Sequence, residues 1–342
     1  MKRRKWVTKG FVFGMVLVVA ALYLSGTSEA APAKVMELSF NNYAPAENWI
    51  NKVFTNWGKE IENGTNGQVK ITLFPGAVLT KADQVYDGVI KGISDIGRSE
   101  LSYTLARFPL MEVTYLPYGA HSAQQASHIT HEIYKKFRPK EFDDTKVLYF
   151  FNAGPLQLHM VKEVNKLEDM KGLKIRVTPL ASDMAKALGA IPVAMPMPDS
   201  YEALRRGVVD GIITSVEPLI SWKLAEVIKS TIKINYGCGN FFVVMNHDKW
   251  NSLSPEAKKV FEEVSEKYVE ICGKGFDEQD EAGYKLSLSR GNKVITLPPE
   301  ELKRWQERWQ FVLEKWVNEK GAMGLPAKAA LDEVLKLQEK YK

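Results

Sequence analysis

Arg176 is the residue whose type and setting point most directly to chemistry. It lies within Lys174–Thr178, where Ile175 and Val177 alternate with it, so it projects from the opposite face of a short strand that we expect to be central in a sheet. A buried guanidinium needs an anionic partner, because an unpaired buried charge is strongly disfavoured. That partner is either a neighbouring Asp or Glu of the chain or the carboxylate of a ligand, which arginine can bind with two N–H groups at once.

Glu217 is a second candidate, and its pattern has two interpretations. The pair Glu217-Pro218 could begin a helix that carries Trp222, because an acid at a helix N-terminus complements the helix dipole. The carboxylate could instead meet an amine or a hydroxyl group of a ligand. Both interpretations remain open at the level of sequence.

Further pocket candidates share a position at predicted strand ends or loop entries, where clefts in α/β sheets collect their ligand-binding residues. They are Tyr43, Arg98, Phe151, Asn152 and Trp222. Arg98 directly follows the predicted strand Ile93–Gly97 and could supply a second positive charge.

The sequence lacks the common motifs for phosphate, dinucleotide or metal chemistry. No P-loop, GxGxxG, GxSxG or HExxH pattern is present, which weakens the case for an enzyme. Three of the five histidines are close together, but no adjacent Cys or Asp completes a set of metal ligands. The histidines are His121, His128, His131, His159 and His247. We therefore predict no cofactor and no metal site.

The cysteines give no sign of a metal or redox motif. Cys238 and Cys272 are the only two, and they form neither a CxxC motif nor a Cys/His ligand spacing. We expect buried free thiols, although an oxidising compartment would permit a disulfide between them.

Length and composition favour a globular, exported protein. The chain has 342 residues, 45% hydrophobic and 25% charged, which suffices for two domains and is too apolar for a disordered chain. Much of its net charge of +5 comes from Lys2–Lys9, which precede the apolar run Phe11–Leu24 and the small-residue stretch Ser28–Ala30. This is the pattern of a cleavable signal peptide, which we assign to residues 1–30. The alternative, an uncleaved membrane anchor, is disfavoured because the apolar run is shorter than the roughly 20 residues that span a bilayer.

Without this leader the chain is nearly neutral and offers no basic surface for nucleic acid. After Pro32, short strands alternate with helices, which predicts an α/β fold with mainly parallel sheets. The first unit is a helix with one apolar face, Trp49–Ile61, followed by the alternating strand Val69–Leu73. The other predicted strands are Ile93–Gly97, Lys146–Phe151, Lys174–Thr178, Val193–Met195, Val208–Ile213, Thr231–Tyr236, Phe241–Met245 and Lys293–Leu297.

Two helical predictions concern the last third of the chain. Ser254-Pro255-Glu256 predicts the start of a helix that continues to about Leu286 and is long enough to pass from one domain to another. Three interior glycines weaken that prediction. Beyond it, tryptophans at helical spacing predict a buried stripe rather than an aromatic cage for a ligand. The stripe is Leu302, Trp305, Trp309, Val312 and Trp316.

Several segments in chain order resemble one family, the solute receptors of tripartite ATP-independent periplasmic (TRAP) transporters, and the resemblance spans nearly the whole mature chain. The segments are Asn66–Ile71 through Phe74–Gly76, Val89–Gly97, Leu167–Val177, Ala187–Ala190 with Pro192 and Pro196, Tyr201–Leu204, Gly207–Gly211, and Phe241–Asn246 with Trp250 and Ser254-Pro255.

The resemblance implies a two-lobed clamshell with a sheet in each lobe and a long helix shared by both. Such a receptor binds an organic-acid anion in the periplasm and hands it to the membrane subunits of the transporter. The family's arginine that pairs with the substrate carboxylate falls on Arg176.

Two departures from the family pattern limit what carries over. Family members often read Gly-Gln-Glu-Asn-Pro where this chain reads Gly211–Pro218, which puts Thr214 in place of the pocket asparagine. Some members have a second basic residue before the arginine segment, but Gly154–Leu158 contains none. These changes favour a monocarboxylate with an apolar or polar tail over a C4-dicarboxylate, and Arg98 could replace the missing cation.

We expect lobe I to comprise residues 31–152 with 240–283 and lobe II residues 153–239 with 284–315, with 254–286 as the shared helix and 316–342 as a C-terminal helical tail. We expect a monomer. Two alternatives stay open, a periplasmic enzyme acting on a small carboxylate and a binding protein that reports to a sensor rather than a permease. The enzyme would need an acid and a base beside Arg176, and the sequence places none there.

Overall fold

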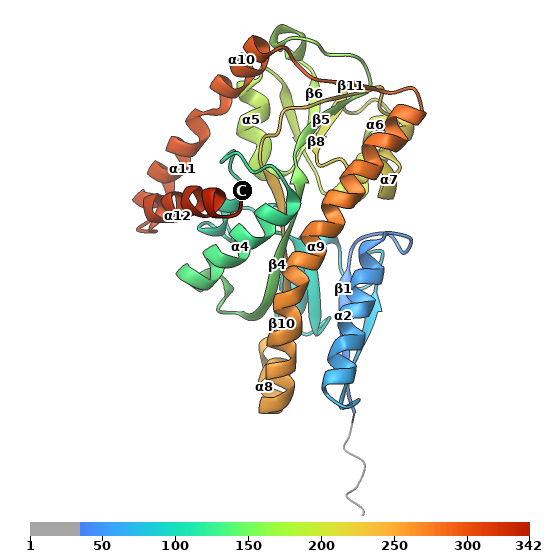
Figure 1. Cartoon of the computed structure of the whole chain (residues 1–342), viewed down its shortest axis with the longest axis vertical. Coiled ribbons are helices and arrows are strands. Elements are labelled where there is room, and N and C mark those ends of the chain that lie inside the picture. Colours follow the sequence, from blue (N-terminus) through green and yellow to red (C-terminus); the bar gives the residue numbers. More distant parts are fainter. Residues whose placement is uncertain (1–34) are drawn as a thin grey trace, which may run out of the picture. The chain divides into compact units, whose positions relative to one another are not determined.

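The computed structural model describes residues 35–342, so the predicted signal peptide lies outside the described residues. Two sheets organise this part of the chain (Figure 1). Sheet A has five strands in the order β2-β1-β3-β10-β4. Its strands are Met36–Asn42 (β1), Val69–Phe74 (β2), Ile96–Glu100 (β3), Thr145–Pro155 (β4) and Cys238–Asn246 (β10).

Sheet B has six strands in the order β11-β9-β5-β8-β6-β7. Its strands are Gln157–Met160 (β5), Lys174–Val177 (β6), Ile191–Ala194 (β7), Gly211–Thr214 (β8), Ser230–Ile232 (β9) and Lys293–Ile295 (β11). The predicted α/β fold with one sheet in each of two lobes is confirmed, and we call the lobes built on sheets A and B lobe I and lobe II.

Both sheets are mixed, which differs from the mainly parallel sheets expected. Strand β10 is antiparallel to β3 and β4, and β5 is antiparallel to β8 and β9. The remaining pairs are parallel, including the central pair β6 and β8. The antiparallel strands are those through which the chain passes between sheets, from β4 into β5 and from β9 into β10. These two crossings touch at Leu156, whose N–H donates to the Gly237 carbonyl at 2.7 Å.

Helices cover the sheets, and most follow from apolar faces or capping residues seen in the sequence. The helix predicted at Trp49–Ile61 is Ile50–Gly64 (α2), with Phe54, Trp57 and Ile61 buried. The other helices are Val85–Ile90 (α3), Ala123–Phe137 (α4), Ser182–Ala187 (α5), Ser200–Arg205 (α6), Pro218–Ser221 (α7), His247–Ser252 (α8), Pro255–Ser289 (α9), Pro299–Trp309 (α10), Phe311–Ala322 (α11) and Ala327–Lys340 (α12).

The predicted long helix is α9, which has 35 residues and runs past both sheets (Figure 1). Its N-cap is Ser254, whose Oγ accepts a hydrogen bond from the Ala257 N–H at 3.1 Å. Two of its glycines permit close approach rather than flexibility. A Cβ at Gly273 would lie 2.7 Å from the Gln124 Cα of α4, and one at Gly283 would lie 2.8 Å from the Val216 carbonyl oxygen.

Helix α9 is attached to both lobes by two carboxylates three residues apart. Asp277 accepts hydrogen bonds from the N–H groups of Ala123 and Gln124 at the start of α4, at 2.6 and 3.0 Å. Asp280 accepts from the N–H groups of Val216 and Glu217, just before α7, at 3.1 and 2.6 Å. One rigid helix therefore fixes the backbone of each lobe through a side chain.

The C-terminal helices bury the predicted tryptophan stripe. Trp305, Trp309, Val312 and Trp316 are all buried, which confirms the packing role, but the stripe is divided between α10 and α11 at Gln310. Both cysteines are buried free thiols. None of the helices in residues 35–342 combines the length and the apolar character that crossing a bilayer requires.

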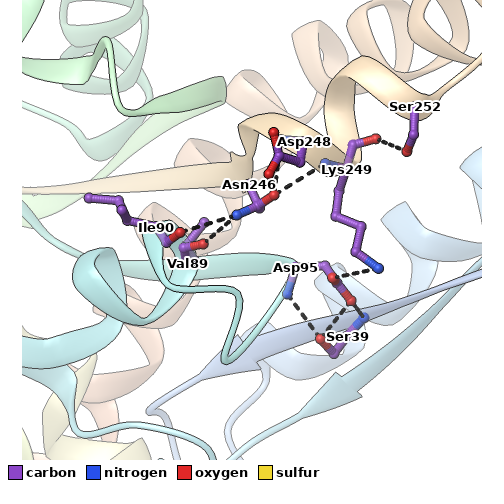
Figure 2. Close-up of polar contacts among 8 residues, drawn as sticks. All are labelled: Ser39, Val89, Ile90, Asp95, Asn246, Asp248, Lys249 and Ser252. Carbon is purple, nitrogen blue, oxygen red and sulfur yellow. Dashed lines mark hydrogen bonds and ion pairs between the residues drawn. The ribbon is translucent and has the colours of Figure 1, made fainter.

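A polar network closes the end of sheet A where β1 and β3 begin (Figure 2). Asn246 donates to the carbonyls of Val89 and Ile90 at 2.9 and 3.3 Å, and its Oδ1 accepts from the N–H groups of Asp248 and Lys249 at 3.0 and 3.1 Å. It thereby terminates α3 and caps α8.

The same network continues to Asp95, just before β3. Its Oδ2 accepts from both the N–H and the hydroxyl of Ser39 at 2.8 Å, and its Oδ1 lies 3.3 Å from the Lys249 Nζ (Figure 2). We call the residues Ser39, Asp95, Asn246 and Lys249 the far-end network.

Candidate ligand-binding site

A cavity lies between residues of the two sheets. Its wall combines aromatic rings with a few charged and hydroxyl side chains. Lobe I contributes Tyr43, Ala44, Asn48, Ile50, Arg98, Glu100, Tyr103, Tyr115 and Phe241; lobe II contributes Arg176, Thr178, Met197, Ile213, Thr214, Ser215, Glu217, Pro218 and Trp222; Phe276 of α9 and Ala153, Leu156 and Gly239, near the points where the chain passes between the sheets, complete it.

Arg176 reaches the cavity from β6 in the interior of sheet B. Its side chain is only 1% exposed. Nε donates to the Met195 carbonyl at 3.0 Å, whereas Nη2 is buried with no hydrogen-bond partner in the described chain. Arg176 is not among the arginines of residues 35–342 that have a carboxylate within 4.0 Å. Those arginines are Arg107, Arg205, Arg206, Arg290 and Arg304. Within residues 35–342, no carboxylate therefore lies within 4.0 Å of the Arg176 guanidinium, and Glu100 interacts with it only over a longer distance.

Arg98, on β3, is also buried, and aromatic rings surround it. Its guanidinium carbon lies 3.9 Å from the ring centre of Phe241, 4.8 Å from that of Tyr43 and 5.5 Å from that of Phe151. Its polar contact is a long one, from Nη1 to the Asn42 Oδ1 at 3.5 Å, and its Nε has no partner in the described chain. Cation–π contacts therefore stabilise Arg98 in place of an ion pair.

Two acids line the same cavity. Glu100 follows Arg98 by two residues on β3, and its Oε1 accepts from the Ser102 hydroxyl at 2.6 Å. Glu217 stands at the start of α7, and its Oε1 accepts from the Trp49 indole N–H at 2.8 Å. Burial raises the pKa of both carboxyl groups above the ordinary glutamate value.

The lobes touch each other across the cavity. The Tyr115 hydroxyl lies 2.6 Å from the Thr178 Oγ1, and the Met197 N–H donates to the Tyr103 hydroxyl at 3.2 Å. The Trp49 indole to Glu217 bond is a third contact of this kind. The described arrangement therefore has both lobes in contact around the site, as expected for a closed clamshell.

His159 supports the lobe II wall from behind. Its Nε2 is 3.1 Å from the Ser215 carbonyl and 3.3 Å from that of Thr214, and its Nδ1 is 2.8 Å from the Thr231 Oγ1. Complete burial lowers the pKa of His159 to about 4, so the ring is neutral at ordinary pH. A neutral imidazole can donate to the Ser215 carbonyl and accept from Thr231 at the same time.

The structure brings six of the eight predicted site residues together. The cavity is lined by Tyr43, Arg98, Arg176, Thr214, Glu217 and Trp222. Phe151 and Asn152 do not line it, because β4 carries them past the cavity inside lobe I. Phe151 packs on Phe241 with ring centres 5.1 Å apart, and the Asn152 amide faces α4. Phe151 is instead a neighbour of Arg98, with its ring centre 5.5 Å from the guanidinium carbon.

Several lining residues were not predicted. Glu100 lies two residues beyond Arg98 on β3, and Thr178 lies two residues beyond Arg176, directly after the end of β6, so the alternation that singled out each arginine could have found them. Tyr103, Tyr115 and Met197 come from irregular segments and 3₁₀ turns, where no periodic pattern marks which side chains face a cavity.

The described residues include no group of three or more His, Cys, Asp or Glu side chains that could hold a metal ion. His131 from the predicted histidine cluster instead lies 3.0 Å from the Glu266 carboxylate.

Comparison with known proteins identifies one matching family. The sequence model of family 7 of the bacterial extracellular solute-binding proteins matches residues 40–320. This is most of the chain and contains every residue of the cavity wall.

Solved structures extend the similarity to three dimensions. A TRAP periplasmic solute-binding protein from Desulfovibrio salexigens is 32% identical with a TM-score of 0.80, covering 90% of this chain and 97% of its own. A TRAP solute-binding protein from Rhodoferax ferrireducens, in complex with copurified benzoate, is 26% identical with a TM-score of 0.85, covering 90% and 98%. One from Bordetella bronchiseptica, with bound mandelate, is 28% identical with a TM-score of 0.84, covering 90% and 100%.

Proposed function

The chain belongs to family 7 of the bacterial extracellular solute-binding proteins, the DctP family of TRAP-transporter receptors, and from that membership we propose that it binds an aromatic monocarboxylate through Arg176. The family consists of solute-binding proteins without enzymatic activity, so the enzyme alternative is excluded. The finer assignments below are our proposal.

The unpaired guanidinium of Arg176 carries the proposal. Its Nη2 is buried without a hydrogen-bond partner in the described chain while Nε is held by the Met195 carbonyl, so the group is oriented and makes no direct ion pair within 4.0 Å. A ligand carboxylate would satisfy it, and such a charge-assisted hydrogen bond contributes about 1.5–3 kcal/mol. Thr178 and Thr214 are nearby hydroxyl residues of the same wall that could bind the carboxylate further.

The remainder of the wall favours one carboxylate and a ring. Arg98 is already stabilised by three aromatic rings, so it has less need of a second anion than Arg176 has. The rings of Tyr43, Tyr103, Trp222 and Phe276 would cover an aromatic ligand from several sides. The benzoate and mandelate bound by the two relatives support this ligand class.

Ligand binding would favour lobe closure, since a molecule between the lobes contacts Arg176 of lobe II and Tyr43 of lobe I at once. A ligand can shift the equilibrium only through its different affinity for the two forms. The proposed lobe boundaries are those given above, residues 31–152 with 240–283 and residues 153–239 with 284–315.

We further propose that the protein acts in the periplasm as a monomer and delivers its ligand to the membrane subunits of a TRAP transporter. The relatives are described as periplasmic TRAP solute-binding proteins, which supports this location. Ligand uptake by vesicles containing the cognate membrane subunits, stimulated by this protein, would distinguish delivery from a role in sensing.

Calorimetry with benzoate and mandelate tests the ligand assignment. We expect Arg176→Lys to lose most of the affinity, because lysine keeps the charge but not the planar pair of N–H groups. Arg206→Lys is the matched control, since Arg206 is exposed on α6's C-terminal side and outside the cavity wall. Undiminished binding by the Arg176 variant, or no binding of either acid by the native protein, would contradict the proposal.

A further inference from the structure

The charges of the cavity are arranged unevenly. Arg176 and Arg98 each lower the pKa of the Glu100 carboxyl group, against the larger effect of burial. Of the two arginines only Arg98 lowers the pKa of the Glu217 carboxyl group, and it does so less than Ser221 and Trp49 do. Glu217 is therefore the cavity acid that the two guanidinium groups influence less.

Glu217 is not occupied by the role of helix cap. Its side chain makes no capping hydrogen bond at the start of α7. The N–H groups of Val216 and Glu217 are instead satisfied by the Asp280 carboxylate from α9, at 3.1 and 2.6 Å. The Asp280 carboxylate thus pairs with the N–H groups at the start of α7, the role that the sequence pattern suggested for Glu217. The Glu217 side chain does not take part in this capping.

One hydrogen bond of good geometry holds the Glu217 carboxylate, from the Trp49 indole to Oε1. The Ser221 hydroxyl is close enough to lower the pKa of the same carboxyl group, although it makes no hydrogen bond of good geometry. The side chain is 3% exposed, so bulk water does not supply the missing donors. An ionised carboxylate can accept about four hydrogen bonds, and leaving a buried acceptor without a donor is unfavourable.

We propose that Glu217 determines specificity by accepting a hydrogen bond from the ligand, so that the protein selects carboxylates whose ring carries a hydroxyl or an ammonium group. This inference rests on the proposed function, because the ligand carboxylate must bind Arg176 for its other end to face Glu217. Both kinds of ligand, with a hydroxyl or with an ammonium group, carry a hydrogen-bond donor at the end of the ring away from the carboxylate. Glu100 is a poorer acceptor for it, because its Oε1 already accepts from the Ser102 hydroxyl and the charges of both arginines act on its carboxyl group.

The test is calorimetry at mildly alkaline pH with three probes of one skeleton. Benzoate has no donor, 3-hydroxybenzoate has a neutral donor, and 3-(aminomethyl)benzoate has a cationic donor. We expect the native protein to bind at least one donor-bearing probe about tenfold or more tightly than benzoate, the scale of a hydrogen bond to a charged group. Which of the two it prefers distinguishes a hydroxyl from an ammonium ligand.

Glu217→Gln keeps the size of the side chain and an acceptor for Trp49 but presents an amide N–H to the cavity. We expect it to remove or reverse the preference while benzoate still binds. Glu202→Gln, on the exposed surface of α6, is the matched control and should keep the native preference. Glu100→Gln tests the other acid of the cavity as the acceptor. If Glu100→Gln loses the preference for donor-bearing probes and Glu217→Gln keeps it, the proposal is overturned.

The outcomes separate this inference from the proposed function. Equal binding of all three probes by the native protein overturns the role of Glu217 and leaves the carboxylate receptor intact. Failure of every probe to bind overturns the aromatic-acid assignment, and the inference with it. A preference that persists in Glu217→Gln also overturns the inference, even when Arg176→Lys abolishes binding.

Discussion

Polar side chains have hydrogen-bond partners in the far-end network, whereas in the ligand cavity some of them are buried without one. In the network, Asn246 makes four hydrogen bonds and both oxygens of Asp95 have partners (Figure 2). In the cavity, Arg176 keeps a buried nitrogen without a partner, and Arg98 does the same. Unpaired buried polar atoms also occur elsewhere in residues 35–342, but the two that belong to guanidinium groups both lie at the cavity, where a ligand can pair with them.

This difference distinguishes the polar residues that stabilise the fold, in the far-end network, from those that are available to bind a ligand, in the cavity. A fully paired polar group contributes to folding, whereas an unpaired buried charge costs folding free energy that only binding can recover. Substitutions in the network should therefore act on unfolding, and substitutions in the cavity on affinity.

The largest expected effect is on affinity at the cavity. Arg176→Met should weaken binding of the preferred carboxylate roughly 30-fold or more, because truncating one partner of a buried charge pair costs about 2–5 kcal/mol. The ligand-free protein should unfold at a urea concentration no lower than the native one, since an uncompensated buried charge is removed. A clear loss of stability without ligand would break the comparison, because it would make Arg176 a structural residue.

Acid should destabilise the protein through His159. Both of its ring nitrogens have hydrogen-bond partners, as the polar groups of the far-end network do, although His159 supports the cavity wall. Its pKa is about 4 when folded against an ordinary value of 6.5, so between these values the unfolded chain binds a proton that the folded protein does not. Stability should therefore fall as pH falls through this window, by about 3 kcal/mol in total. Urea unfolding across this pH range measures the slope, which His159→Gln should reduce; an unchanged slope in that variant would assign the acid sensitivity to other groups.

Asn246→Ala should lower the free energy of unfolding by about 2 kcal/mol, because it removes the cap of α8 and leaves two carbonyls of α3 without donors. Affinity for the carboxylate should stay the same. Asn251→Ala, an exposed position on α8, is the matched control and should change stability by less than about 0.5 kcal/mol. A loss of affinity in the Asn246 variant would show that the two regions are coupled.

The smallest expected effect belongs to the exposed part of the network. Lys249→Ala removes an ion pair to Asp95 in which the lysine side chain is 46% exposed, so the loss should be below about 1 kcal/mol. It should shrink further in high salt, which screens such pairs. Denaturant unfolding at low and high salt would check this, and a loss that is independent of salt would argue against a Coulombic contribution.

The sequence located Arg176 because strand alternation is a local pattern that a short segment displays completely. The same reasoning predicted α9 from Ser254-Pro255 and the buried tryptophans from their helical spacing. It did not predict the break between α10 and α11 or the antiparallel strands, since both depend on how distant segments pack.

The partners of the site residues were beyond sequence reasoning for a related reason. Trp49 and Glu217 are 168 residues apart and meet only when both lobes have formed. The two interpretations of Glu217 could not be compared without Asp280, which supplies the backbone contacts from α9. Phe151 and Asn152 were placed in the pocket because a strand end marks a region, not the direction in which each side chain points.

The two carboxylates of α9 have a mechanical consequence. Asp277 holds the start of α4 and Asp280 holds the turn before α7, both from one uninterrupted rod. If the hydrogen bonds of both carboxylates persist when the lobes open, they limit how far lobe I and lobe II can rotate apart. We therefore expect two well-defined arrangements of the lobes, separated by a small rotation, rather than a broad range of orientations.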